Sequence, residues 1–433
     1  MTTSTRTAQG LLEALAPLAG GHARLAGDGD AVAGVSPKVA LEPAGEDEIA
    51  AVLAFADGEG LQVVVRGGGT QLGLGYPPRG ADILLSTAGL AKVVEYSPHD
   101  LTVTVEAGMP LHALQETLAP SRQWLALDPD VSDEATIGGI VATNATGASR
   151  LRYGGVRDQI IGIRFVTADG TVAKGGGKVV KNVAGYDLPK LFTGSLGTLG
   201  VIVAASFRLY PLPEASRTVV LTARDPEPLC DLAVRVMGTT LTPSILDVMG
   251  ATAGEDTYTC ASRFESLREA CDDQAQRLIE MAGELGATAR TVAGDEETNF
   301  WRNARGGRPP RDHGSTMTIK VSLLPVDVAG WLADLRKTVA AAGVSARWRA
   351  HAGHGLIFAH LDGGDAPLVE MVEQLRQAAL AHDGSLVVID APPALSEHMD
   401  VWGPSAALEV MRRLKASFDP KVTLNPGRFI GRI

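Results

Sequence analysis

The chain has 433 residues, of which 45% are hydrophobic and 21% charged, and its formal net charge is -11. These values are typical of a globular protein with two or three domains, and they argue against nucleic acid or an anionic lipid surface as the main partner, because both require a basic face. No apolar run approaches the roughly 18 residues of a membrane span, and Glu13 interrupts the short apolar stretch near the start. We therefore expect neither a membrane-spanning helix nor a signal peptide.

The first half of the chain alternates short helix and strand patterns with glycine-rich loops. Helices are expected at 9–19, 46–60 and 110–120, and strands at 61–65, 81–87, within 93–108, as a hairpin over 158–176, and at 198–213. The Gly- and Asp-rich stretch that follows the first helix predicts a linker or an extended arm.

Beyond Pro213 the glycine-rich loops become rarer, and strand and helix patterns alternate as far as about residue 390. This order predicts an α+β domain with one antiparallel sheet. A last helix over 405–418 ends at Asp419-Pro420 and precedes the tail KVTLNPGRF. The cysteines Cys230, Cys260 and Cys271 lack CxxC spacing, so we expect reduced packing residues, no metal site and a cytoplasmic protein.

The stretch VVVRGGGTQLGLG, residues 63–75, ends a predicted strand in a loop with few side chains. It is not a P-loop, since no Gly-Lys-Ser/Thr closes it, and it is not a Rossmann loop, since YPPRG follows where a helix would begin. Successive backbone N–H groups in such a loop can bind a phosphate, and the missing Cβ atoms leave room for a ligand. A tight turn without a ligand is the alternative.

Two further loops of the same kind follow, within LDPDVSDEATIGGIVATNATGASRLRYGGVRD and KVVKNVAGYDLPKLFTGSLGTLGVIV. Together, the motifs in this order resemble the FAD-binding domain of the vanillyl-alcohol oxidase superfamily, also called the PCMH type, over about residues 40–213. The tail DPKVTLNPGRF resembles the end of the C-terminal domain of FAD-linked oxidases. KVVKNVAGYDL with GSLGTLG further resembles the E subunits of bacterial glycolate oxidases.

The resemblance implies an α+β fold, with a two-subdomain PCMH-type FAD-binding domain followed by an α+β FAD-linked oxidase C-terminal domain. The expected boundaries are an N-terminal arm at 1–37, the FAD-binding domain at 38–213, the C-terminal α+β domain at 214–400, and a helix and tail at 401–433 that return to the FAD-binding domain. Carried over position by position, the cofactor-binding residues are Arg66, Gly67, Gly68, Gly69, Thr70, Gln71, Pro129, Asp130, Thr136, Ile137, Gly138, Gly139, Asn144, Gly147, Gly200, Val201, Ile202 and Asn425. Many relatives tether the flavin to a histidine in the first loop, where this chain has Thr70-Gln71, so non-covalent FAD is expected.

The segment HAGHGLIFAHL resembles only in part the His-x-Gly-Asp-Gly-Asn-x-His motif of 2-hydroxy-acid dehydrogenases of this superfamily. His354, Leu356 and Phe358 replace the Asp, the Asn and the second His, and Leu and Phe cannot ligate a hard cation. One interpretation is a degenerate site in which His351 and His354 are leftover or packing residues, and in which His351, the remaining catalytic candidate, lacks an oriented partner. The alternative is an altered site formed by His351, His354 and Glu397.

Three functional hypotheses follow from the resemblance. The first is an FAD-binding subunit of a glycolate oxidase complex, which supports or transfers electrons from glycolate oxidation to glyoxylate, with a D-type flavin subunit and an iron–sulfur subunit as partners. Any attachment to the inner face of the membrane would then be made through a partner. The second is a free-standing FAD-dependent 2-hydroxy-acid dehydrogenase, and the third is a structural partner that has lost its flavin.

Overall fold

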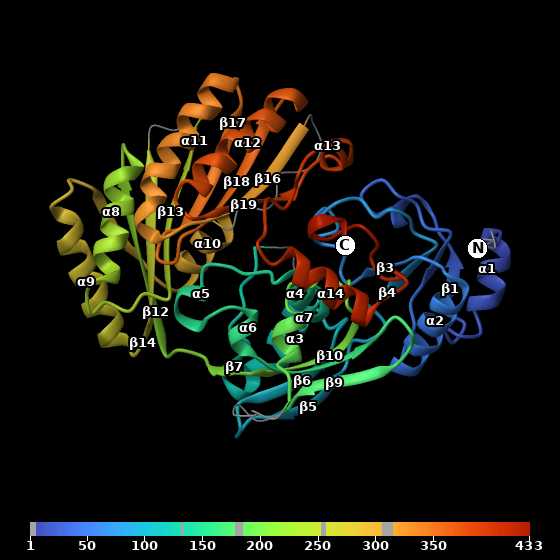
Figure 1. Cartoon of the computed structure of the whole chain (residues 1–433). Helices are drawn as coiled ribbons and strands as arrows, with labels where there is room; N and C mark the ends of the chain where they lie inside the picture. Colours follow the sequence, from blue (N-terminus) through green and yellow to red (C-terminus); the bar gives the residue numbers. More distant parts are fainter. Residues whose placement is uncertain (1–5, 131–133, 178–184, 253–256, 305–314) are drawn as a thin grey trace. The chain divides into compact units, whose positions relative to one another are not determined.

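The computed structural model describes residues 6–130, 134–177, 185–252, 257–304 and 315–433, and the chain divides into two compact units (Figure 1). The first unit consists of Met1–Thr146, Gly155–Pro211 and Pro404–Ile433. The second consists of Gly147–Gly154 and Leu212–Gly403. The C-terminal helix and tail therefore belong to the first unit, and a short segment within the first half of the chain belongs to the second.

A small four-stranded sheet opens the first unit, in the order β1 (Ala23–Leu25), β2 (Val39–Leu41), β4 (Ile83–Ser86), β3 (Val63–Arg66). β2, β4 and β3 are parallel, whereas β1 is antiparallel to β2. Helices α1 (Ala8–Leu15) and α2 (Glu46–Glu59) contribute to its core. α2 has three acidic residues in its first turn and ends at Gly60, whose φ of 67° is favourable for glycine.

The expectation of an N-terminal arm at 1–37 is wrong, because the described residues of this segment fold into the first unit. Leu11 and Leu15 of α1 are fully buried, and β1 pairs with β2. Asp30, in the short 3-10 helix Asp28–Asp30, is also buried and accepts hydrogen bonds from Arg24. The glycines and aspartates of this segment thus form tight turns within the first unit, and composition alone does not distinguish such turns from a linker.

The second sheet of the first unit has five antiparallel strands, as the hairpin and long-strand patterns predict. Their order is β5 (Val93–Ser97), β6 (Thr102–Glu106), β10 (Val201–Arg208), β8 (Ile160–Val166), β9 (Val172–Gly176). A two-stranded ribbon of β7 (Gln123–Trp124) and β11 (Tyr210–Pro211) accompanies it. The helices of this part are α3 (Leu111–Leu118), α4 (Ile137–Thr143), α6 (Val156–Gln159), α7 (Leu188–Phe192) and α14 (Leu408–Phe418), with 3-10 turns at Ala119–Ser121 and Ile430–Arg432.

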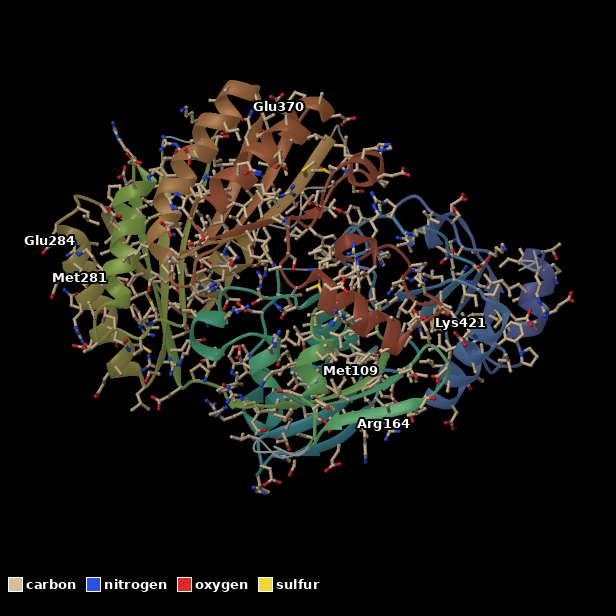
Figure 2. All side chains as sticks on the ribbon, viewed as in Figure 1. Met109, Arg164, Met281, Glu284, Glu370 and Lys421 are labelled. Carbon is tan, nitrogen blue, oxygen red and sulfur yellow. The ribbon has the colours of Figure 1, made fainter. Side chains whose placement is uncertain are left out.

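Contacts between the two sheets make the first unit a single body. Val201 and Val203 of β10 share a hydrophobic core with α2 and the small sheet. Arg164, which projects from β8 in Figure 2, forms an ion pair with Glu46 at the start of α2. The terminal helix α14 packs Leu414 and Phe418 on the core of the five-stranded sheet.

The second unit is built on one antiparallel sheet of eight strands, which confirms the α+β expectation. The order is β15 (Thr288–Val292), β12 (Ala215–Ala223), β14 (Tyr258–Ser266), β13 (Ile245–Ala251), β17 (Ser345–His351), β18 (Leu356–Gly363), β16 (Ser315–Ser322), β19 (Ser385–Asp390). The remaining elements are α5 (Arg150–Tyr153), α8 (Pro226–Met237), α9 (Arg268–Gly283), α10 (Gly294–Ala304), the 3-10 turn Pro325–Asp327, α11 (Val328–Ala342), α12 (Asp365–Leu380) and α13 (Pro393–His398).

The four long helices α8, α9, α11 and α12 bury apolar residues against this sheet (Figure 1). The charged side chains of Glu284 and Glu370 are exposed at α9 and on α12 (Figure 2). No helix in the described part of the chain is long and apolar enough to cross a membrane.

Candidate functional site

A cavity with an empty volume of about 750 Å³ lies in the first unit. The lining comes from the loop after β3, from α4 and its flanks, from the loop before β10, and from the C-terminal tail. The described residues that line it are Val65, Gly67, Gly68, Gly69, Thr70, Gln71, Leu72, Thr87, Ala135, Thr136, Gly138, Gly139, Ile140, Ala142, Thr143, Ala145, Leu196, Gly197, Gly200, Ile202, Asn425 and Arg428.

Eleven of the residues that the resemblance implied lie together in this lining, although they come from segments far apart in the sequence. They are Gly67, Gly68, Gly69, Thr70, Gln71, Thr136, Gly138, Gly139, Gly200, Ile202 and Asn425. Of the KNVAGYDL motif, residues 181–184 lie outside the described residues, and Gly185–Leu188 do not line the cavity.

The glycines of the first loop allow it to contact the second loop. A Cβ atom on Gly68 would lie 1.9 Å from the carbonyl oxygen of Glu134, and one on Gly67 would lie 2.3 Å from Oγ1 of Thr136. These distances are far too short for any side chain. The expectation that the missing Cβ atoms leave room for a ligand is therefore corrected at Gly67 and Gly68, where the space is taken by a neighbouring loop. Gly69 has a φ of 73°, which is a reason for glycine there.

Thr136 links the two loops through its hydroxyl group. Its Oγ1 accepts a hydrogen bond from the backbone N–H of Gly68 at 3.3 Å and caps α4 by accepting one from Gly139 at 3.4 Å. Threonine is a favoured residue at this capping position. The same residue thus begins the helix and fixes the glycine loop beside it.

Asn425 of the tail connects two other walls of the cavity. Its Oδ1 accepts a hydrogen bond from the backbone of Val65 at 3.2 Å, and its Nδ2 donates one to the carbonyl of Leu196 at 2.8 Å. Gly197 must lack a side chain, because a Cβ atom there would lie 2.5 Å from Nδ2 of Asn425. The asparagine therefore fixes the walls of the cavity as well as lining it.

A buried ion pair anchors the tail that carries Asn425. Nζ of Lys415 donates to Asp419 at 2.6 Å and to the carbonyls of Thr198 and Leu424 at 2.8 and 2.9 Å. Asp419 in turn accepts hydrogen bonds from the backbone N–H groups of Thr423 and Leu424. Burial lowers the pKa of Lys415, and Asp419 opposes that effect.

Arg428 is a lining residue that the sequence analysis did not single out. It is 2% exposed and donates to the carbonyls of Leu72 and Leu74, which fixes the end of the glycine loop. Burial lowers its pKa to about 10, so it remains charged at neutral pH. The tail motif contains this arginine, but no pattern in the sequence indicates that its side chain is buried.

The residue types of this lining suit FAD. Among the described lining residues Arg428 is the one cation, and none is a carboxylate. The site thus offers backbone groups and one positive charge to a diphosphate, which carries negative charge. Apolar side chains such as Ile140, Ile202 and Leu196 offer contacts to a flat ring. When bound, FAD would supply hydride and electron transfer, and the first loop, α4 and the tail would bind and orient it.

Seven of the implied cofactor-binding residues do not line the cavity: Arg66, Pro129, Asp130, Ile137, Asn144, Gly147 and Val201. Ile137 and Val201 have fully buried side chains at the first positions of α4 and β10, and Asn144 ends α4 with a φ of 51°. Gly147 belongs to the second unit. These positions support the walls or adjoin them.

Arg66 lies beside Asp30 instead, with its guanidinium 3.3 Å from the carboxylate. Asp30 also binds Arg24, whose hydrogen bonds lower the pKa of Asp30 well below its usual value despite burial. The side chain of Arg66 is therefore committed to a charge network within the small sheet. Arg66 does not line the cavity.

The second unit contains a buried polar cluster around Asp247, on β13. The carboxylate is fully buried and accepts hydrogen bonds from Nε of Arg349 at 2.6 Å and from Nδ1 of His351 at 2.8 Å. Burial alone would raise the pKa of Asp247, but the interactions with Arg349 and His351 outweigh it and lower the pKa below its usual value. The expectation that His351 lacks an oriented partner is therefore wrong. The aspartate within the otherwise apolar strand SILDVMG is the sequence signal that could have indicated this partner.

The altered site of His351, His354 and Glu397 does not form a metal site. These residues are all described, yet no group of three His, Cys, Asp or Glu side chains in the described part of the chain could bind a metal ion. The thiols of Cys230, Cys260 and Cys271 are free and buried, as expected of packing residues. The family pattern of metal ligands is thus not met by the residues that replace it here.

Comparison with known proteins supports FAD as the cofactor. Residues 37–176 match the family described as "FAD binding domain", and residues 212–388 and 397–429 match "FAD linked oxidases, C-terminal domain". The chain is 28% identical to a probable mitochondrial D-lactate dehydrogenase of Danio rerio, over 91% of this chain and 84% of that protein. It is 38% identical to glycolate oxidase subunit GlcE of Escherichia coli (strain K12), over 36% of this chain and 44% of that protein.

The fold is also similar to that of a solved structure, the 4-ethylphenol oxidase of Gulosibacter chungangensis in complex with isoeugenol. The TM-score is 0.76 at 15% sequence identity, over 98% of this chain and 97% of that chain. At this level of identity the likeness concerns the fold.

Proposed function

This chain belongs to the FAD-linked oxidases and is an FAD-dependent oxidoreductase, and we propose that it is an FAD-binding subunit of a complex that oxidises short 2-hydroxy acids such as glycolate. The observation that carries the proposal is a contrast within the chain. The cavity of the first unit has the loops expected of a flavin site, whereas the described residues of the second unit do not form the metal site of the family's 2-hydroxy-acid dehydrogenases. A D-type flavin subunit would then carry the primary oxidation, and an iron–sulfur subunit would accept electrons.

The relatives support the substrate class. One of them is named for D-lactate and another for glycolate, and both compounds are 2-hydroxy acids. Because the match to GlcE covers 36% of this chain, the subunit role rests on that partial likeness and on the substituted HAGHGLIFA segment. We further propose that the protein acts in the cytoplasm, with any attachment to a membrane made through its partners.

A free-standing 2-hydroxy-acid dehydrogenase is the second candidate, and the Asp247–His351 pair favours it. Oxidation of a 2-hydroxy acid requires a base that takes the hydroxyl proton, and histidine commonly serves as one. The hydrogen bond from Nδ1 to Asp247 at 2.8 Å leaves Nε2 of His351 as the proton acceptor. Carboxylates orient catalytic histidines in this way in other enzymes.

Rapid-mixing kinetics distinguish the two candidates. The isolated, FAD-loaded chain is mixed with glycolate, or D-lactate, and reduction of the flavin is followed by its absorbance. The subunit role predicts slow reduction that a D-type partner accelerates about a hundredfold or more, and little change in the complex on His351→Ala. Fast reduction of the isolated chain that is lost in His351→Ala would establish the free-standing enzyme instead. His382→Ala is the matched control, since this exposed histidine also pairs with an aspartate, Asp327, at 3.0 Å.

We also propose that FAD binds reversibly, because Thr70 and Gln71 stand where many relatives have a tethering histidine. Precipitation of the protein with trichloroacetic acid should leave the yellow colour in the supernatant. Flavin that stays with the precipitate would show a covalent bond.

A further inference from the structure

The two faces of the eight-stranded sheet differ in character. Val248 and Cys260 are paired across β13 and β14 and point to one side of the sheet. The neighbouring pair, Asp247 and Ala261, points to the opposite side, because side chains alternate along a strand. This second side, which we call the polar face, is covered in part by α10 and by the segment around α5, through Trp301 and Ala148.

Charged and aromatic side chains form a row on the polar face. Lys320 of β16 lies opposite Phe358 of β18, and Phe358 lies opposite Arg349 of β17. His351 follows two residues after Arg349 and therefore lies on the same side. The rings of His351 and Phe358 are 5.5 Å apart, and those of His351 and His354 are 5.3 Å apart.

Three of the side chains named here, Arg349, Lys320 and Arg150, are cationic, and Asp247 is a carboxylate that forms an ion pair with Arg349. A second carboxylate, Asp390, lies opposite Thr318 of β16. Lys320 and Arg150 of α5, a helix that contacts β13, have no ion-pair partner among the described residues. Burial lowers the pKa of Lys320, and the charge of Arg150 lowers it further. Cations without an ion-pair partner are available to an anion.

The two histidines add unpartnered polar atoms to the same place. Nε2 of His351, whose side chain is 1% exposed, and both ring nitrogens of His354 are buried and make no hydrogen bond within the described residues. Burial, helped by His351 and Arg150, lowers the pKa of His354 to about 4, so this ring is neutral at physiological pH. A neutral imidazole can donate one hydrogen bond and accept another.

A divalent metal ion does not suit this cluster. Its described members do not provide the three ligands that a metal site requires. Lys320, Arg150 and Arg349 would repel a cation, and apolar Leu356 and Phe358 occupy positions where the family pattern has ligands. The residues thus do not fit the metal site of the family's 2-hydroxy-acid dehydrogenases.

We propose that the polar face of the second unit binds a carboxylate without a metal ion, with Lys320 and Arg150 supplying the positive charge and His351 and His354 the hydrogen bonds. The identity of the carboxylate, a short 2-hydroxy acid, rests on the proposed function. The absence of a metal rests on the residues of this chain alone.

Binding of oxalate to the FAD-loaded full-length chain tests the proposal, because oxalate resembles a 2-hydroxy acid in size and charge and has no C–H bond to oxidise. Elemental analysis should find bound metal far below one equivalent per chain. Titration calorimetry without added metal should give the same oxalate affinity before and after treatment of the protein with EDTA. A stoichiometric metal ion, or oxalate binding that EDTA removes, would overturn the proposal.

Variants locate the bound anion. Lys320→Met should weaken oxalate binding by about tenfold or more, the usual effect of losing one charged hydrogen bond. Lys337→Met is the matched control, since Lys337 is exposed on α11, and it should change nothing. Arg150→Gln provides a second variant at an exposed side chain, where loss of folding is not expected, and it should weaken binding several-fold. Unchanged binding in both Lys320→Met and Arg150→Gln would place oxalate elsewhere and refute the site.

The outcome is separable from that of the proposed function. Metal-independent oxalate binding that depends on Lys320, combined with no flavin reduction by any 2-hydroxy acid even with a D-type partner, would refute the proposed function and support the anion site. Flavin reduction by glycolate that requires a metal ion would support 2-hydroxy-acid oxidation and refute the metal-free site.

Discussion

The cavity of the first unit and the polar face of the second are formed by different kinds of chemical groups. Glycines, backbone groups and two hydrogen-bonded tail residues, Asn425 and Arg428, form much of the cavity. The polar face consists of side chains that can carry charge, among them Asp247, Lys320 and His351. In our proposals, the cavity binds FAD mainly through its shape and backbone groups, and the polar face binds an anion through charge. A substitution should therefore act through packing in the cavity and through electrostatics on the polar face.

The largest effect is expected where the cavity does depend on a charge, at the buried pair that anchors the tail. Asp419→Asn removes the partner of Lys415, whose side chain is 6% exposed. Loss of one member of a buried ion pair costs about 3–5 kcal/mol, so the free energy of unfolding should fall by that order and FAD should dissociate more readily. Urea unfolding and flavin fluorescence measure both changes.

Asp57→Asn is the control for that variant. It breaks the ion pair of Asp57 with Lys421, whose side chain is 56% exposed. An exposed pair contributes about 0–1 kcal/mol. Equal losses from the two substitutions would show that burial of the Lys415–Asp419 pair does not matter.

Gly68→Ala tests whether the first loop acts through packing. The new Cβ atom would overlap the carbonyl of Glu134, and relief of such crowding typically costs about 1–3 kcal/mol. If the cofactor-competent loop arrangement bears this cost, FAD affinity should fall about tenfold to a hundredfold. Equilibrium dialysis of FAD provides the measurement.

Gly58→Ala, in α2 with open space around its Cβ position, should leave FAD affinity unchanged. An unaltered affinity in Gly68→Ala would mean that the two loops separate without consequence for the cofactor.

His354→Gln tests the electrostatics of the polar face through pH. The pKa of His354 in the folded protein is about 4, below its ordinary value near 6.5, so between these values the unfolded chain binds a proton that the folded chain does not. Wild-type stability should therefore fall as pH decreases from about 6.5 to 4, by about 1–3 kcal/mol from this residue. The variant should lose less stability over that interval, as measured by urea unfolding at several pH values.

His382→Gln, at an exposed histidine, serves as the reference for that slope. Identical pH dependence in the wild type and His354→Gln would contradict the buried, neutral state of His354.

The smallest effect is expected for Arg66→Ala, although the sequence motif placed Arg66 on the cofactor. Its guanidinium pairs with Asp30 and does not line the cavity, and Arg24 remains as a partner of Asp30. FAD affinity should change by less than about threefold, since partly exposed ion pairs contribute little. A loss of tenfold or more by dialysis would show that Arg66 contacts FAD directly.

Much of the fold followed from patterns that are local in the sequence. Hydrophobic periodicity and turn residues predicted α2, the β8–β9 hairpin and α14, because each depends on neighbours within a few residues. The N-terminal arm was misjudged, because Leu11 and Leu15 are buried in a core formed with residues that are distant in the sequence, such as Ile83 and Leu85 of β4.

The sequence by itself determined which segments line the cavity that we propose for FAD, because a glycine loop is a backbone feature and Gly67–Gly69, Thr136 and Gly138 can be recognised from their order in the chain. Tertiary structure alone decided which side chains meet. Asp247 and His351 are separated by 104 positions and become hydrogen-bonded because β13 and β17 are neighbours in the sheet. Strand order sets such meetings, and it depends on the packing of the whole unit, which no single segment specifies.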